Sequence, residues 1–160
     1  MAQPVFLELE GANQGEIKGQ PELGITGEAD AIEDKIECLT YSDGVDRPME
    51  AGGVAPGGNS IHSPIMITKW VDKSSALLHE AMKNNEELTG TFKFYRASLS
   101  GDGGFEHYYT VEIKKARVAS MVFVSPEGNE KALESIAISY REITWTYEDG
   151  GLTCADTGGS

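Results

Sequence analysis

The sequence has few cysteines, no long apolar segment and no recognisable leader. Two cysteines, Cys38 and Cys154, stand among 160 residues, too few for the disulfide framework of a small secreted scaffold. Cys38 lies in an apolar run, so a buried free thiol is expected there. No basic stretch followed by an apolar one opens the chain, and no apolar run approaches a membrane span. We therefore expect a soluble, cytoplasmic product that does not insert into a membrane.

Basic residues are half as numerous as acidic ones, with thirteen against twenty-six and a net charge of -13. A surface of this kind repels the phosphates of nucleic acids and of anionic membranes. We expect no nucleic-acid partner. Acidity alone selects no other partner, because it also serves solubility.

Motifs that carry chemistry are also missing. His62, His79 and His107 have no neighbouring His, Cys or Asp at the spacing of known metal sites. No serine lies in a nucleophile-elbow pattern, and no glycine pair leads into the Lys-Ser/Thr ending of a phosphate loop. We expect no metal, no cofactor and no enzymatic activity. One alternative is a hydrolase whose site is assembled only in space.

The stretch from Ile61 to Arg96 contains the one clear helical pattern. Apolar residues at 77, 78, 81 and 82 predict a short helix from Ser75 to Asn84, with all four on its buried stripe. Asp72 and the two following serines offer acceptors at its start, and Asn84-Asn85 can end it. The preceding strand carries apolar groups on both faces, so we expect it to be largely covered.

Period-2 alternation fills most of the remaining chain and predicts short strands separated by turns. The expected strands are Pro4–Glu10, Lys35–Tyr41, 89–96, Phe105–Ala116, Arg117–Ser125 and Leu133–Tyr147. The Lys35–Tyr41 segment also has some helical spacing. Within 133–147 the apolar parity switches at Arg141-Glu142, which indicates either a bulge or a strand that crosses between sheets. We predict a mainly β fold, a barrel or sandwich with one flanking helix.

Two segments resist assignment. Asp43 to Ser60 is rich in glycine and proline, so we expect no regular element there: either a loose surface loop or a segment that orders against a partner. Residues 149–160 carry almost no apolar side chains and should form a flexible tail. We expect one domain over residues 1–148.

Three blocks in the right order resemble the Hcp (hemolysin-coregulated protein) family, the tube proteins of bacterial type VI secretion systems. They are PVFLELEGANQGEIKG near the start, ITKWVDKSSALLHEAM followed by FYR, and LESIAISYREITWTY near the end. Three features depart from the family pattern: Ala76 stands where a proline often begins the helix, and the 43–60 loop and the tail are particular to this chain.

The resemblance implies a compact two-sheet β-barrel with a flanking helix, like that of phage tail-tube proteins. It implies homo-hexameric rings that stack head to tail, a contractile sheath and a tube-tip spike as partners, and effector proteins in the lumen. It also implies export without a signal peptide and no catalysis. In the family the long loop reaches the neighbouring ring, so the stacking candidates are Asp46, Arg47, Met49, Glu50 and Val54. The alternative function is a stand-alone barrel that binds a small ligand in a deep apolar pocket.

Overall fold

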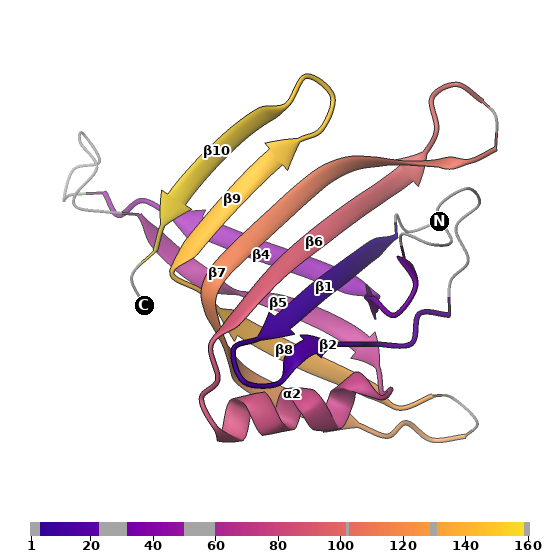
Figure 1. Cartoon of the computed structure of the whole chain (residues 1–160), viewed down its shortest axis with the longest axis vertical. Helices are drawn as coiled ribbons and strands as arrows, with labels where there is room; N and C mark the ends of the chain where they lie inside the picture. The colour runs from indigo at the N-terminus through magenta and orange to yellow at the C-terminus, as the bar shows by residue number, and fades with distance from the viewer. Residues whose placement is uncertain (1–3, 23–31, 50–59, 102, 129–130, 159–160) are drawn as a thin grey trace.

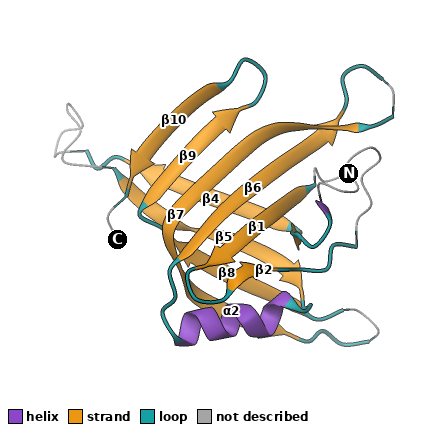
Figure 2. Ribbon diagram, in the orientation of Figure 1, coloured by secondary structure: helices purple, strands orange, loops and turns teal. Residues whose placement is uncertain are grey.

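The computed structural model describes residues 4–22, 32–49, 60–101, 103–128 and 131–158. This part of the chain is mainly β, with one helix, α2, whose two ends are both defined (Figure 2). The mainly β prediction with a single helix is confirmed. The elements are β1 Val5–Gly11, β2 Gly15–Ile17, β3 Ile36–Cys38, β4 Thr40–Asp46, β5 Ile61–Trp70, α2 Ser74–Lys83, β6 Leu88–Ala97, β7 Phe105–Val124, β8 Leu133–Ser139, β9 Glu142–Tyr147 and β10 Leu152–Thr157.

All ten strands belong to one antiparallel hydrogen-bonded sheet that folds back on itself. Its path runs β2-β1-β6-β7-β8-β5-β4, with β3 beside β1 and with β9 and β10 beyond β7. Strands β1, β6, β7, β9 and β10 form a front layer, and β8, β5 and β4 cross behind them (Figure 1). Within the described residues the path ends at β2 and β4, so the sheet is open.

Strand β7 joins the two layers. Its first half pairs with β6 and β9, and its second half, from Arg117 onward, pairs with β8. The sequence predicted two strands here, Phe105–Ala116 and Arg117–Ser125, and this was wrong. A single residue, Lys115, adopts φ 52° and bends one continuous strand, where we expected a break.

The core lies between the layers and is filled by alternate side chains of both. Phe92 and Val111 of the front layer and Ile65 and Ile138 of the back layer are fully buried. The expectation that the strand before the helix is covered on both faces is wrong. Met66 is 45% exposed on its outer face, because nothing in the described chain covers the back of the sheet.

Helix α2 begins at Ser74, one residue before the predicted start, where the N–H of Ser74 donates to Oδ1 of Asp72 at 2.8 Å. It ends where Asn85 takes φ 50° and the N–H of Glu86 donates to the Ala81 carbonyl at 2.9 Å. Leu78 and Ala81 are buried as expected. Leu77 is 37% exposed, so its place on the predicted stripe is corrected: the buried positions are 74, 75, 78 and 81.

The expected strand Lys35–Tyr41 is divided into β3 and β4, and β4 continues to Asp46 through a bulge between Ser42 and Gly44. The first residues of the expected 43–60 loop are therefore strand. Backbone hydrogen bonds to β5 hold this segment as a strand, a conformation that its glycine-containing sequence does not favour by itself.

The final region separates at Arg141 into β8 and β9, which lie in different layers, so the crossing interpretation is confirmed. The expected flexible tail is wrong for residues 152–157, which form β10 against β9. Gly150 and Gly151, both with positive φ, make the turn between them. The apolar pattern of the sequence could not predict β10, because nearly all residues of this strand are exposed.

Candidate interaction surfaces

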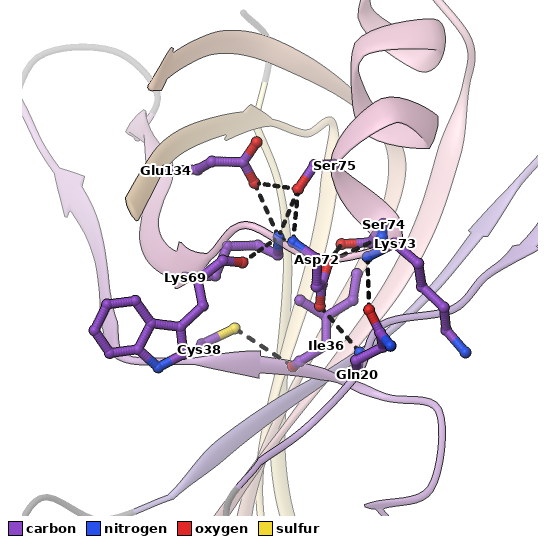
Figure 3. A network of polar contacts seen from close by, with 10 residues as sticks. Gln20, Ile36, Cys38, Lys69, Asp72, Lys73, Ser74, Ser75 and Glu134 are labelled. Atoms are coloured by element: carbon purple, nitrogen blue, oxygen red, sulfur yellow. Dashed lines mark hydrogen bonds and ion pairs between the residues drawn. The ribbon is translucent and has the colours of Figure 1, made fainter. Parts of the chain in front are cut away.

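A buried polar network ties α2 to β5 and β8 of the back layer (Figure 3). The ammonium of Lys69 on β5 lies 2.9 Å from Oε2 of Glu134 on β8 and 3.0 Å from Oδ1 of Asp72. The hydroxyl of Ser75 on α2 donates to Glu134 at 2.8 Å. The side chains of Lys69 and Glu134 are 1% and 3% exposed, so each ion depends on the other for its solvation.

Asp72 links this network to the β2–β3 connection. Its Oδ2 accepts the backbone N–H of Gln20 at 3.0 Å. Burial alone would raise the pKa of Asp72, but hydrogen bonds from Ser74 and Gln20 and the charge of Lys69 leave that pKa below its usual range. The carboxylate is therefore ionised at neutral pH and holds the helix start in place.

His62 is buried between β10 and the β8–β9 connection. Its Nε2 lies 2.9 Å from Oδ2 of Asp156, and its Nδ1 lies 2.8 Å from the hydroxyl of Tyr140. A carboxylate can only accept, so Nε2 donates its proton to Asp156, and the Tyr140 hydroxyl can serve Nδ1 as donor or as acceptor. Burial and two nearby aspartates, Asp43 and Asp156, raise the pKa of Tyr140 to about 12. This cluster fastens β10 to the body of the domain.

The remaining residues that could take part in catalysis or metal binding lie apart from one another. His79 is exposed on α2, and His107 bonds the Thr110 hydroxyl at 2.7 Å. Burial raises the pKa of Cys38 to about 12, so its thiol stays protonated. Among the described residues, no group of three His, Cys, Asp or Glu is arranged to hold a metal ion. None of the described helices has the length and hydropathy to cross a bilayer.

The outer faces of the two layers differ in chemistry. On the front layer, neighbouring strands place charged and threonine side chains in register, in the rows Glu8–Thr91–Glu112–Thr144 and Lys93–Thr110–Thr146–Thr153. On the back layer the corresponding rows are uncharged: Thr40–Thr68–Ser135–Val122 and Ser42–Met66–Ala137–Ser120. Val122 is 53% exposed there. Exposed rows without charge, on so acidic a chain, are typical of a contact surface.

The structure places the loop candidates at the end of the β4–β5 hairpin. Asp46 ends β4 opposite Ile61. Arg47 and Met49 follow it and are exposed, Met49 by 56%. Glu50 and Val54 lie outside the described residues, so the structure does not test whether the five candidates share a surface.

Sequence reasoning missed both buried polar clusters. One signal was available: Lys69 shares the inward parity of Ile65 and Ile67, where an unpaired charge would be costly. No signal was available for His62 and Asp156, which are 94 residues apart in sequence.

These features define a structural β domain, in which the buried polar clusters join elements of the fold and the outer faces remain available for contact. Comparison with known proteins shows the family of this domain. The profile of the family described as "Type VI secretion system effector, Hcp" matches residues 6–147. The chain is also 32% identical to the "Major exported protein" of Pseudomonas aeruginosa, over 98% of this chain and 95% of that one.

Solved structures agree with this match. A crystal structure titled Hcp protein superposes with a TM-score of 0.84 at 28% identity, covering 98% of this chain and 99% of the other. Hcp1 from the Escherichia coli EAEC 042 pathovar, a double mutant, gives 0.83 at 27% identity over 98% and 99%. The chain belongs to the Hcp family of type VI secretion proteins, and the resemblance inferred from its three blocks is confirmed. The comparisons do not support the ligand-binding alternative.

Proposed function

We propose that this chain, a tube subunit of a type VI secretion system, closes into six-membered rings that stack head to tail. The observation that carries the proposal is the match to Hcp proteins over nearly the whole chain. The structure adds a physical reason for assembly. Among the described residues, strand β10 pairs only with β9, on one side, and an unpaired strand edge favours contact with another chain unless it is covered.

A closed ring covers such edges without open-ended growth, whereas head-to-tail stacking is a heterologous contact that extends into filaments. In the ring we expect the open sheet to complete a compact two-sheet barrel like that of phage tail-tube proteins. The ring lumen carries effector proteins, and the contractile sheath and tube-tip spike are further partners. We expect export without a signal peptide and a structural role without catalysis, performed by the β domain, which includes β10.

Mass in solution tests the ring. Six chains of 17.2 kDa give about 103 kDa, which native mass spectrometry or light scattering separates from a monomer. A monomer at high protein concentration would refute the ring. The expected absence of catalysis is tested by replacing His62, His79 and His107 together. Loss of export from a variant that still folds and still forms rings would contradict a purely structural role.

The 43–60 loop is proposed to contact the next ring, through residues such as Arg47 and Met49. Because Asp46 and Ile61 are paired across β4 and β5, a short Gly-Ser link can replace residues 47–59 without opening the hairpin. We expect this deletion to preserve the ring mass and to reduce stacking, seen as shorter tubes by electron microscopy, and export. Folded monomers from the same deletion would instead place the loop in the contact within one ring.

A further inference from the structure

Exposed apolar side chains gather at the two ends of the back layer. Seven of the eleven large apolar residues that are exposed in the described chain lie there. The first end, which we call the loop end, is where β4 meets β5, and it carries Val45, Met49 and Ile61. The second, which we call the hairpin end, is where β7 and β8 meet beside the end of β5, and it carries Val71, Val122, Phe123 and Val124. Exposed apolar groups concentrated in this way are typical of contact surfaces.

Strand β5 sets the two ends on opposite sides of the domain. Its first residue, Ile61, pairs with Asp46 at the end of β4. Its last residue, Trp70, pairs with Leu133 of β8, and Leu133 pairs in turn with Val124 of β7. Because β5 has ten residues, a strand rise of about 3.3 Å per residue separates the two ends by roughly 30 Å. Figure 1 shows β5 running from the left of the domain, where β4 ends, to the lower right, where β8 begins.

The two ends also carry charges that are not paired within the described chain. Arg47 is exposed at the loop end, and Glu127, three residues beyond Val124, is exposed at the hairpin end. Neither of them lies in an ion pair with another described residue. Asp46, beside Arg47, carries the opposite charge, so an attraction between Arg47 and Glu127 only adds to a contact that depends on apolar area.

Apolar surfaces at opposite ends of one chain cannot bury each other within that chain. In a stack of copies that all face the same way, the loop end of one copy meets the far end of the next. Copies with a net charge of -13 repel one another. Removing apolar area from water stabilises a contact whatever its net charge, so it offsets this repulsion.

We propose that the hairpin end receives the loop end of a copy in the next ring, with Met49 packed against Val122 and Val124. The inference rests on the proposed stacking of rings and names the surface that receives the loop. The occupant is a second copy of this chain, because the same chain presents a matching apolar surface at its opposite end. Such a contact joins unlike ends, so it can repeat from ring to ring.

Two variants add the same charge at opposite ends. Val122→Glu/Val124→Glu alters the hairpin end, and Met49→Glu/Ile61→Glu alters the loop end. Each takes the net charge from -13 to -15, since each replacement subtracts one. We expect both variants to keep the ring mass of about 103 kDa in light scattering. Each alone should need a protein concentration roughly tenfold or more above that of the unchanged chain before its rings stack, as seen by electron microscopy.

Mixing the two kinds of preformed ring gives the sharpest test. A ring altered at the hairpin end keeps an intact loop end, and a ring altered at the loop end keeps an intact hairpin end. Only one intact contact can form between them, so we expect pairs of rings, about 206 kDa for twelve chains, and no longer stacks. If like ends met each other instead, each variant alone would form pairs of rings through its intact ends, which would overturn the proposal.

Two further variants control for charge and for folding. Met66 and Ser120 lie in one row of the same outer face, between the two ends. Met66→Glu/Ser120→Glu also gives a net charge of -15, and it should stack like the unchanged chain. Val122→Thr/Val124→Thr keeps β-branched side chains that suit a strand. It should therefore fold even where the glutamates of the hairpin-end variant prevent folding, and it should weaken stacking several-fold.

The outcomes separate this inference from the proposed ring. An unchanged chain that is monomeric, or whose rings do not stack at any concentration, would refute the proposed function and the inference with it. If the unchanged chain and both hairpin-end variants stack equally well, the proposed function stands and the receiving surface is overturned. Folded monomers from Val122→Thr/Val124→Thr would place the hairpin end in the contact within one ring, which also overturns the inference. A charge control that stacks as poorly as the hairpin-end variant would show that added charge alone is responsible, with the same consequence.

Discussion

Replacing Lys69 with methionine should destabilise this domain more than any other single loss of charge. The Lys69 ammonium is buried among Glu134, Asp72, the Ser75 hydroxyl and the Trp70 carbonyl, the last at 2.8 Å. Methionine fills similar space without the charge, so Glu134 would remain buried, 3% exposed, with only the Ser75 hydrogen bond. The variant therefore isolates the cost of an uncompensated buried carboxylate.

Removing one partner of a buried ion pair costs about 3–5 kcal/mol, because the other ion loses both water and its counter-charge. That is a large share of the roughly 5–15 kcal/mol by which domains are stable. With a urea m-value near 2 kcal/mol/M, the unfolding midpoint should fall by roughly 1.5–2.5 M. Removing both ions, as in Lys69→Met/Glu134→Leu, should recover much of the loss, because no isolated charge remains.

Urea unfolding followed by far-UV circular dichroism measures this, at one fixed protein concentration because ring formation also stabilises the fold. Lys73→Met is the matched control. Its ammonium lies 3.1 Å from Asp34, but the two side chains are 45% and 38% exposed, so we expect a change below about 1 kcal/mol. The reasoning fails if Lys69→Met and Lys73→Met have the same midpoint, or if the double variant is less stable than Lys69→Met.

Two further predictions concern the core and acid stability. Leu78→Ala should lower the free energy of unfolding by about 2–5 kcal/mol, since Leu78 is 1% exposed. Leu77→Ala, on the exposed side of the helix, should lower it by less than about 0.5 kcal/mol. Equal losses in thermal or urea unfolding would contradict the observed helix orientation. The folded-state pKa of Asp72 is lowered from 3.8, so its stabilisation is complete above that value and is lost as pH falls through the folded pKa. The urea midpoint should therefore fall as the pH is lowered below about 4, and Asp72→Asn should make this dependence of the midpoint on pH weaker. An unchanged dependence would show that Asp72 is not responsible.

Local patterns predicted the elements whose signal is contained in a few neighbouring residues. The α2 start depends on Asp72, two residues before Ser74, and its end depends on Asn85 in a left-handed conformation. Both signals are visible in sequence because capping is a local interaction. The switch of apolar parity at Arg141 likewise indicated the crossing between layers, which the structure has at that residue.

Where sequence prediction failed, the deciding interactions came from distant residues. Strand β10 has no buried apolar face; its backbone pairs with β9, and Asp156 bonds His62 from 94 residues away. The bend at Lys115 depends on two different partners, β6 with β9 before it and β8 after it, and no turn residue marks it. The site candidates Asp46, Arg47 and Met49 could be proposed only from the family resemblance, because exposed loop residues follow no periodicity.

The sequence by itself determined the fold class and the family, because alternating apolar residues specify a β core and three blocks that resemble the family span the chain in the right order. Only the tertiary structure decided which charges lie together. Lys69 meets Glu134 across 65 residues, and Arg141 joins Lys115 and Arg117 because β7 bends beside the β8–β9 connection. Charge has no period along the chain, so the buried Lys69–Glu134 pair and the grouping of Lys115, Arg117 and Arg141 arise only when the sheet folds back on itself.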